Sequence, residues 1–200
     1  QHEAADLPPE TWLQLLQLAH EDKRAAFRLY AQHYLATHGQ CCWSDTMQQS
    51  TYLPSYAEYL ESARCETPQR ETAARETLVI GEHYVPRERL MAFMQRARTV
   101  LRAHGSEVIY GTIRSILRDT VSFLPWAKDD YACVVFNLRT VHTAAGLERT
   151  ATAFRALTDA SLALGGSFFL TYHRYASAAQ VEAAHPRFRE FLHRKRALDP

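Results

Sequence analysis

The sequence lacks the features that mark several large classes of protein. Its 200 residues contain no apolar run near the roughly 20 residues that a membrane-spanning helix needs. The first residues, Gln1–Asp6, have neither the basic nor the apolar segment of a signal peptide. We therefore expect a soluble, globular, cytoplasmic protein without a transmembrane segment.

Glycine is scarce, and neither sign of charge dominates. Only 7 glycines occur, and none belongs to a glycine-rich loop of the kind that cradles a pyrophosphate. Lys and Arg together number 23 and Asp and Glu 22, so no overall field attracts nucleic acid or an acidic membrane. The basic residues of the C-terminal segment, Arg187, Arg189, Arg194, Lys195 and Arg196, are accompanied by apolar residues that should pack on the other side of a helix, namely Phe188, Phe191, Leu192 and Leu198. This pattern favours a solvated amphipathic helix over a nucleic-acid contact.

The cysteine pattern gives no sign of a disulfide framework or a metal site. The 4 cysteines, Cys41, Cys42, Cys65 and Cys133, show no C-x-x-C spacing, and an adjacent pair is a poor start for disulfides. We expect reduced thiols, in keeping with the cytoplasm, and no bound metal. No positive neighbour in the sequence marks Cys133 as a nucleophile.

Residues 1–75 are expected to form a helical extension, an aromatic loop and a linker. Two apolar stripes in residues 1–38 indicate either one long helix or two shorter ones. The aromatic residues of Cys42–Pro54 are typical of an ordered loop over a pocket, or equally of a packed connector. A short helix over Ser55–Arg64 and a mobile linker over Glu66–Arg75 complete this part.

Residues 76–200 show two strand–helix units. Strands are expected at Thr77–Val85, Glu107–Ile116, Tyr131–His142 and Ser167–Tyr172, with helices after Pro86 and over Leu147–Leu164. This order predicts an α+β domain with a ferredoxin-like β-α-β-β-α-β antiparallel sheet. Both helices should cover one face of that sheet and leave the other open for a ligand or another domain.

Strand alternation predicts which residues lie on the open face. In the third strand, alternate apolar residues should meet the helices, so the residues between them point away. The same reasoning applies to the second strand, and the polar residues expected on the open face are Tyr110, Thr112, Arg114, Asn137 and Arg139. In the first strand the alternation is ambiguous, because Glu82 and Tyr84 share a face with Leu78 and Ile80. A face of this composition is too polar for a core, which favours a binding site.

An ordered set of short motifs resembles a known family. The motifs are Gly81–Glu88, Thr112–Arg114, Phe123–Leu124, Gly165–Phe168, His185–Phe188 and Arg194–Pro200. Together they resemble the C-terminal substrate, or cap, domain of FAD-linked oxidoreductases of the vanillyl-alcohol-oxidase type. The pattern is most similar to alditol oxidases, decaprenylphosphoryl-ribose oxidases and sterol Δ24-reductase-like flavoproteins.

The resemblance implies that this chain is one part of a flavoprotein oxidoreductase. In that family an N-terminal domain holds FAD, and the C-terminal sheet closes over the flavin ring. A FAD-binding domain of the same parent protein would then be the partner, and a small alcohol, polyol or sugar-like molecule the substrate. An activated double bond is an alternative substrate. The resemblance assigns catalytic and cofactor contact to Arg114 and substrate contact to Asn137, and we expect Tyr110 and Thr112 to contact substrate from the same open face.

The chain departs from the family pattern at two places. Thr112 stands where alditol-oxidase-like members carry a glutamate, and Tyr172, His173 and Arg174 stand where members often place a lysine. We expect His173 to serve as the catalytic base, with Tyr172 and Arg174 contacting substrate. The alternative is a free-standing ferredoxin-like module that binds a ligand or forms a homodimer through its open face, without redox activity.

Overall fold

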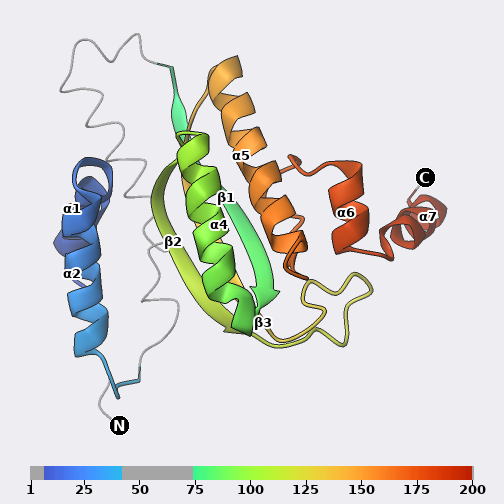
Figure 1. Ribbon diagram of the computed structural model, residues 1–200, viewed down its shortest axis with the longest axis horizontal. Helices are drawn as coiled ribbons and strands as arrows, with labels where there is room; N and C mark the ends of the chain where they lie inside the picture. The colour runs from blue at the N-terminus through green and yellow to red at the C-terminus, as the bar shows by residue number, and fades with distance from the viewer. Residues whose placement is uncertain (1–6, 42–73, 200) are drawn as a thin grey trace. The chain divides into compact units, whose positions relative to one another are not determined.

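The computed structural model describes residues 7–41 and 74–199, which belong to two compact units (Figure 1). The first unit ends at Ala73 and the second begins at Ala74. The aromatic loop, the helix over 55–64 and nearly all of the linker that the sequence predicts lie outside the described residues.

The described residues of the first unit, 7–41, form two helices, α1 (Pro9–Glu21) and α2 (Lys23–Ala36). Asp22 separates them, because its carboxylate accepts hydrogen bonds from the backbone N–H groups of Arg24 and Ala25 and caps α2. The first predicted stripe is buried, at Trp12, Leu15, Leu16 and Ala19. The second predicted stripe, formed by Phe27, Tyr30, Ala31 and Tyr34, is not buried. Phe27 is 73% exposed, and α2 has no buried residue.

The second unit is a mixed helix and sheet structure. Its elements are β1 (Glu76–Pro86), the short 3-10 helix η3 (Arg87–Arg89), α4 (Leu90–Ala103), β2 (Glu107–Ile116), β3 (Tyr131–Val141), α5 (Ala144–Leu162), β4 (Ser167–Phe168), α6 (Ala178–Ala184) and α7 (Phe188–Leu198). The four strands form one sheet in the order β2-β3-β1-β4, and every neighbouring pair is antiparallel. The observed class is therefore α+β.

The long strands β1, β3 and β2 are joined at one end by Arg139. Its guanidinium donates to both carboxylate oxygens of Glu76 at 2.7 Å, and to the carboxylate of Glu107 at 3.0 Å. A register shift between Val108 and Tyr110 places one extra residue in β2. This bulge brings both Glu107 and Tyr110 to the same side of the sheet, where they pair with Arg139 and Asn137.

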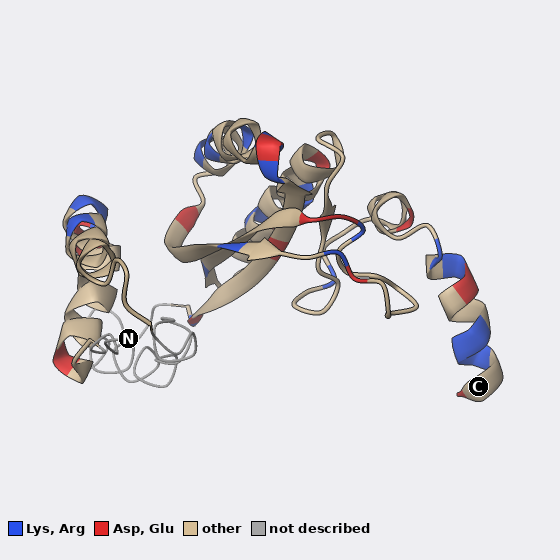
Figure 2. Ribbon diagram, turned by 90° about the horizontal axis from the view of Figure 1, so that it is seen from below, with Lys and Arg blue, Asp and Glu red and all other residues tan. Residues whose placement is uncertain are grey.

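Helices α4 and α5 lie side by side on one face of the sheet (Figures 1 and 2). The core between helices and sheet contains the apolar row of β3 expected from the sequence, namely Ala132, Val134, Phe136 and Leu138. Phe93 of α4 and Phe154 of α5 are completely buried in it. A Cβ on Gly81 would lie 2.1 Å from the Phe154 ring, so β1 needs glycine where that ring crosses it.

A second, smaller apolar cluster lies on the opposite face of the sheet. It contains Tyr84, Tyr131, Cys133 and Val135, with Ala127 contributed by the loop between β2 and β3. Asp119 shapes this loop by accepting hydrogen bonds from the backbone N–H groups of Val121 and Ser122 at 3.0 and 2.9 Å. These bonds hold the pKa of Asp119 at about 2, so its carboxylate stays charged at neutral pH.

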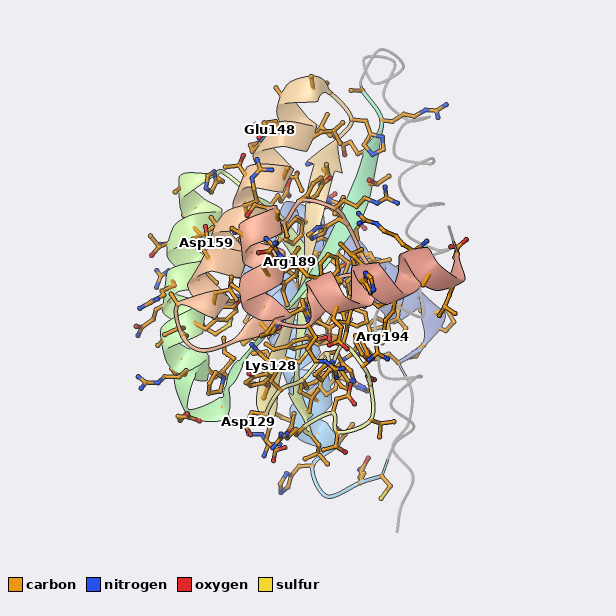
Figure 3. The ribbon with its side chains drawn as sticks, turned by 90° about the vertical axis from the view of Figure 1, so that its right-hand side faces the viewer. Lys128, Asp129, Glu148, Asp159, Arg189 and Arg194 are labelled. Atoms are coloured by element: carbon orange, nitrogen blue, oxygen red, sulfur yellow. The ribbon has the colours of Figure 1, made fainter. Side chains whose placement is uncertain are left out.

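Helices α6 and α7 follow a short loop after β4. Gln180 of α6 donates to the carboxylate of Asp159 on α5 at 2.6 Å, and this bond joins α6 to α5. Asp159 is labelled in Figure 3. In α7 the acidic Glu190 lies between basic residues (Figure 2), and Arg194 pairs with Glu190 at 2.7 Å. The expected packing of the apolar side of α7 is wrong at Leu198, which is 86% exposed.

Two predicted boundaries need correction. The fourth strand ends at Phe168 instead of Tyr172. The backbone N–H of Phe169 still donates to the backbone carbonyl of Glu82 on β1, and the chain leaves the sheet after this bond. Helix α5 begins at Ala144, where the Thr143 side chain accepts from the N–H of Gly146 and caps it. Leu147, the first residue of the helix expected from the sequence, is 42% exposed.

Candidate functional site

The polar residues predicted for the open face of the sheet do lie together there. Tyr110, Thr112 and Arg114 of β2 pair in register with Asn137, Val135 and Cys133 of β3. Paired residues of an antiparallel sheet point to the same side, which here is the side away from α4 and α5. We call this surface the polar face and define it by Tyr110, Thr112, Arg114, Asn137 and their cross-strand neighbour Glu82.

Exposure varies across the polar face. Arg114 is exposed, while Tyr110 and Thr112 are half-buried. Asn137 is 0% exposed, so the expectation of a contiguous exposed patch is wrong at this residue. Asn137 lies in the middle of β3, between Tyr110 of β2 and Ile80 of β1, and these flanking side chains shield it.

Asn137 has unmet hydrogen-bonding capacity. Neither its amide nitrogen nor its amide oxygen has a hydrogen-bond partner, and the buried Oγ1 of Thr112 has none. A buried amide without partners costs about 1–3 kcal/mol, and folded proteins rarely keep one without a reason. These two side chains are therefore prepared to bind a polar group that enters the polar face.

A carboxylate that the sequence reading left ambiguous stands at the centre of the same face. Glu82 of β1 pairs in register with Val135 of β3, and its Oε1 accepts a hydrogen bond from Cys133 Sγ at 2.8 Å. Burial raises the pKa of the Cys133 thiol, and the bond to Glu82 raises it further. Cys133 is thus a neutral donor to the carboxylate and not a nucleophile.

Two phenols also converge on Glu82. Burial raises the pKa of Tyr84 well above its usual range, and the charge of Glu82 and a hydrogen bond to it add to the effect. Tyr172 behaves in the same way: burial is the largest cause of its raised pKa, followed by the charge of Glu82 and a hydrogen bond to it. The cluster of Glu82, Cys133, Tyr84 and Tyr172 thus contains one carboxylate, a thiol that donates to it, and two phenols with raised pKa values.

Arg114 acts on this cluster from the side of β2. Its positive charge opposes the effect of Glu82 by lowering the pKa of Tyr172 and of Cys133. The hydroxyl of Tyr172 thus lies within range of both a carboxylate and a guanidinium. Because Tyr172 is 46% exposed, it is the member of the cluster that a ligand reaches first.

The structure does not bring His173 to this cluster. Its ring packs on the helix side of the sheet, with centroids 4.4 Å from Phe154 and 4.6 Å from Tyr175. Burial lowers the pKa of His173 to about 4, so the ring is neutral at pH 7. Arg174 is exposed in the loop after β4. Of the three residues predicted after the fourth strand, only Tyr172 interacts with the cluster.

Sequence reasoning missed Glu82 and Tyr84 as site residues. Along β1 these two residues alternate with Gly81 and His83. Because Gly81 lies against the Phe154 ring of α5, Gly81 and His83 face the helices, and Glu82 and Tyr84 face the opposite side of the sheet. Had the pairing of β1 with β3 been known, the row of Ile80, Glu82 and Tyr84 would have followed from the pleat alone.

The described residues set limits on what this site can hold. In residues 7–41 and 74–199, no group of three His, Cys, Asp or Glu side chains is close enough to bind a metal ion. Among the same residues, no helix is both long enough and apolar enough to cross a membrane. The guanidinium, amide and phenol groups of the polar face suit a flat ring with polar edges or a hydroxylated substrate. They offer no cradle for a pyrophosphate.

Comparison with known proteins adds no identification. Neither the models of known protein families nor the curated proteins include a match to this chain.

Proposed function

We propose that the chain is the substrate-binding cap of a FAD-dependent oxidoreductase that acts on an alcohol, polyol or sugar-like molecule. The observation that carries this proposal is the polar face, where Arg114 and Glu82 share one side of the sheet with the unpartnered amide of Asn137. The sheet order and the two helices on one face also suit the ferredoxin-like cap of such enzymes. The motif resemblance supports the same assignment.

The residues of the polar face fit one side of a flavin and its substrate. Flavin, when bound, takes a hydride from an alcohol carbon, or gives one to an activated double bond. Arg114 supplies a fixed positive charge where negative charge develops during that transfer. Asn137 and Thr112 have donors and acceptors without partners that can bind substrate hydroxyls, and Tyr110 lies opposite Asn137 on the neighbouring strand.

Binding of FAD itself is assigned mainly to another domain of the parent protein. The sequence has no glycine-rich phosphate loop, and the polar face provides contacts to one side of a ring only. The proposal therefore makes the FAD-binding domain the partner of this chain.

The test compares the chain alone with the full-length protein. We expect the purified 200-residue chain to fold without a stoichiometric visible flavin spectrum. The full-length protein should carry FAD and bleach when sorbitol, glycerol or glucose is added without oxygen. A full-length protein without flavin, with the chain forming a homodimer through the polar face, would overturn the proposal in favour of a binding module.

A further inference from the structure

We infer that a cavity beside α6 and α7 binds a small amphiphilic carboxylate of the kind represented by a medium-chain fatty acid. The apolar chain fills the cavity, and the carboxylate pairs with the ammonium group of Lys128. The residues that line this cavity include none of the polar face. The inference therefore goes beyond the proposed function and does not depend on it.

The cavity lies where the loop between β2 and β3 meets the connection from α6 to α7. Its volume is about 280 Å³, near the lower end of the range for ligand pockets, roughly 300 to 1,000 Å³. Most of the residues that line it are apolar, namely Leu124, Pro125, Ala184 and Pro186. Such a wall suits a hydrocarbon chain, because it offers few hydrogen-bonding groups to a sugar or a nucleotide.

Lys128 brings an unpaired positive charge to this apolar wall. Its side chain is half-buried, and burial lowers the pKa of the ammonium group. In the described part of the chain no carboxylate pairs with it. The adjacent Asp129 accepts from the backbone N–H of Asp130 at 2.8 Å, and Asp130 lies 3.8 Å from the guanidinium of Arg87. Partial burial of a charge without a counter-ion costs free energy, and a bound carboxylate offsets that cost.

Two arginines add positive charge next to the cavity. Arg187 lines it, and Arg187 and Arg194 both lie over the ring of Phe123, with Cζ at 3.8 and 4.6 Å from the ring centroid. Both guanidinium groups pair with the same carboxylate, that of Glu190, at 3.1 and 2.7 Å. Lys128 and Arg194 lie on the side of the second unit where α7 runs (Figure 3). The positive charge of this region favours an anionic head group over a neutral one.

His185 gives the cavity a buried polar wall without charge. Its Nε2 lies 3.2 Å from the backbone carbonyl oxygen of Phe168, and because a carbonyl only accepts, Nε2 donates and Nδ1 carries no proton. Burial lowers the pKa of His185, and the positive charge of Lys128 adds to this effect. The imidazole and the ammonium group therefore sense each other, so the NMR signals of His185 report on an anion that binds at Lys128.

The test titrates the 200-residue chain with octanoate below its micellar concentration and follows the ring resonances of His185 by NMR at pH 7. We expect these resonances to shift and saturate, while those of His104, at the C-terminal end of α4, stay constant. 1-Octanol should bind at least about 10-fold more weakly, because its neutral head group cannot pair with Lys128. Shorter carboxylates should bind about 4-fold more weakly for each methylene group removed.

Variants of Lys128 test the head-group contact. Lys128→Met should weaken octanoate binding about 10-fold and leave 1-octanol binding unchanged, because Met keeps an unbranched apolar stem and has no charge. Lys128→Arg should keep most of the preference for octanoate. Lys195→Met, a change at an exposed lysine of α7 that does not line the cavity, is the matched control and should bind octanoate as wild type does.

Three results would each overturn the inference. A His185 signal that does not shift with millimolar octanoate would show that the cavity takes no such ligand. Equal affinity for octanoate and 1-octanol would show an apolar cavity without a carboxylate contact. An octanoate affinity that Lys128→Met leaves unchanged would remove Lys128 from the site. None of these measurements uses flavin, so each of these results leaves the proposed function as it stands.

Discussion

At the scale of single residues, the structure contains two kinds of buried polar side chain that should respond oppositely to mutation. Asn137 is buried without a hydrogen-bond partner, whereas the buried hydroxyl of Thr140 contacts the hydroxyl of Thr150 at 3.0 Å. The first is a cost to folding, and the second is an ordinary satisfied core group.

Asn137→Leu should therefore raise the free energy of unfolding of the chain by about 1 kcal/mol, because it removes an unpartnered amide from a buried position. Thr140→Val, the matched control, should lower it by about 1 kcal/mol, because it leaves Thr150 without its partner. Urea unfolding followed by circular dichroism measures both. A loss of stability in Asn137→Leu as large as in the control would mean that the amide is satisfied in solution.

His83 should make the chain sensitive to acid. Burial lowers its pKa from 6.5 to about 3, so between these values the unfolded chain binds a proton that the folded chain does not. Stability is therefore fully present above pH 6.5 and is lost as the pH falls toward 3. Between pH 6.5 and 4.5 this one residue should cost about 2 kcal/mol.

The variant His83→Phe isolates this contribution. A phenyl ring can occupy the space among Phe93, Phe136 and Phe154 that the imidazole occupies, and it cannot titrate. Urea unfolding at pH 6.5 and pH 4.5 should show a smaller loss of stability in the variant than in wild type. Equal losses would indicate that His83 is not protected from protonation in the folded state.

At the scale of elements, Arg139 joins three strands. It bonds both oxygens of Glu76 on β1 and one oxygen of Glu107 on β2, and its own strand, β3, lies between them. Arg139→Met should lower the free energy of unfolding by about 2 kcal/mol, because paired charge-assisted bonds are stronger than neutral ones and two carboxylates lose their partner. Arg149→Met, at an exposed position on α5, should change it by less than about 0.5 kcal/mol. Thermal melts of the two variants side by side test the difference.

The elements also show which parts of the fold and the site can be predicted from the sequence alone. Alternation along β2 and β3 predicted the residues of the polar face, because a long strand with one buried side imposes a period of two. The end of β4 could not be predicted, since a strand of two residues has no period. The position of His173 depends on a ring contact with Phe154, which is distant in sequence. The cluster around Glu82 likewise depends on the register between β1 and β3.

At the scale of the whole molecule, the two faces of the sheet in the second unit differ in composition. One side is packed by α4 and α5 and gives the unit its stability. The other side carries Arg114, Glu82 and Asn137, which lie outside the core that the helices cover. Because Arg114 and Glu82 lie outside the core that the helices cover, we expect substitutions there to change the proposed flavin reaction more than the free energy of unfolding.

Arg114 tests this central claim most directly. In the full-length protein, Arg114→Met should leave the melting temperature and FAD content almost unchanged and slow flavin reduction by sorbitol about 10²- to 10³-fold, because a fixed charge opposite developing negative charge is lost. Arg114→Lys should recover only part of the rate, since an ammonium cannot reproduce the planar guanidinium. The measurement is stopped-flow reduction of the bound flavin, recorded beside a thermal melt. Reduction in Arg114→Met at the wild-type rate would contradict the account and leave Arg114 a surface residue outside the site.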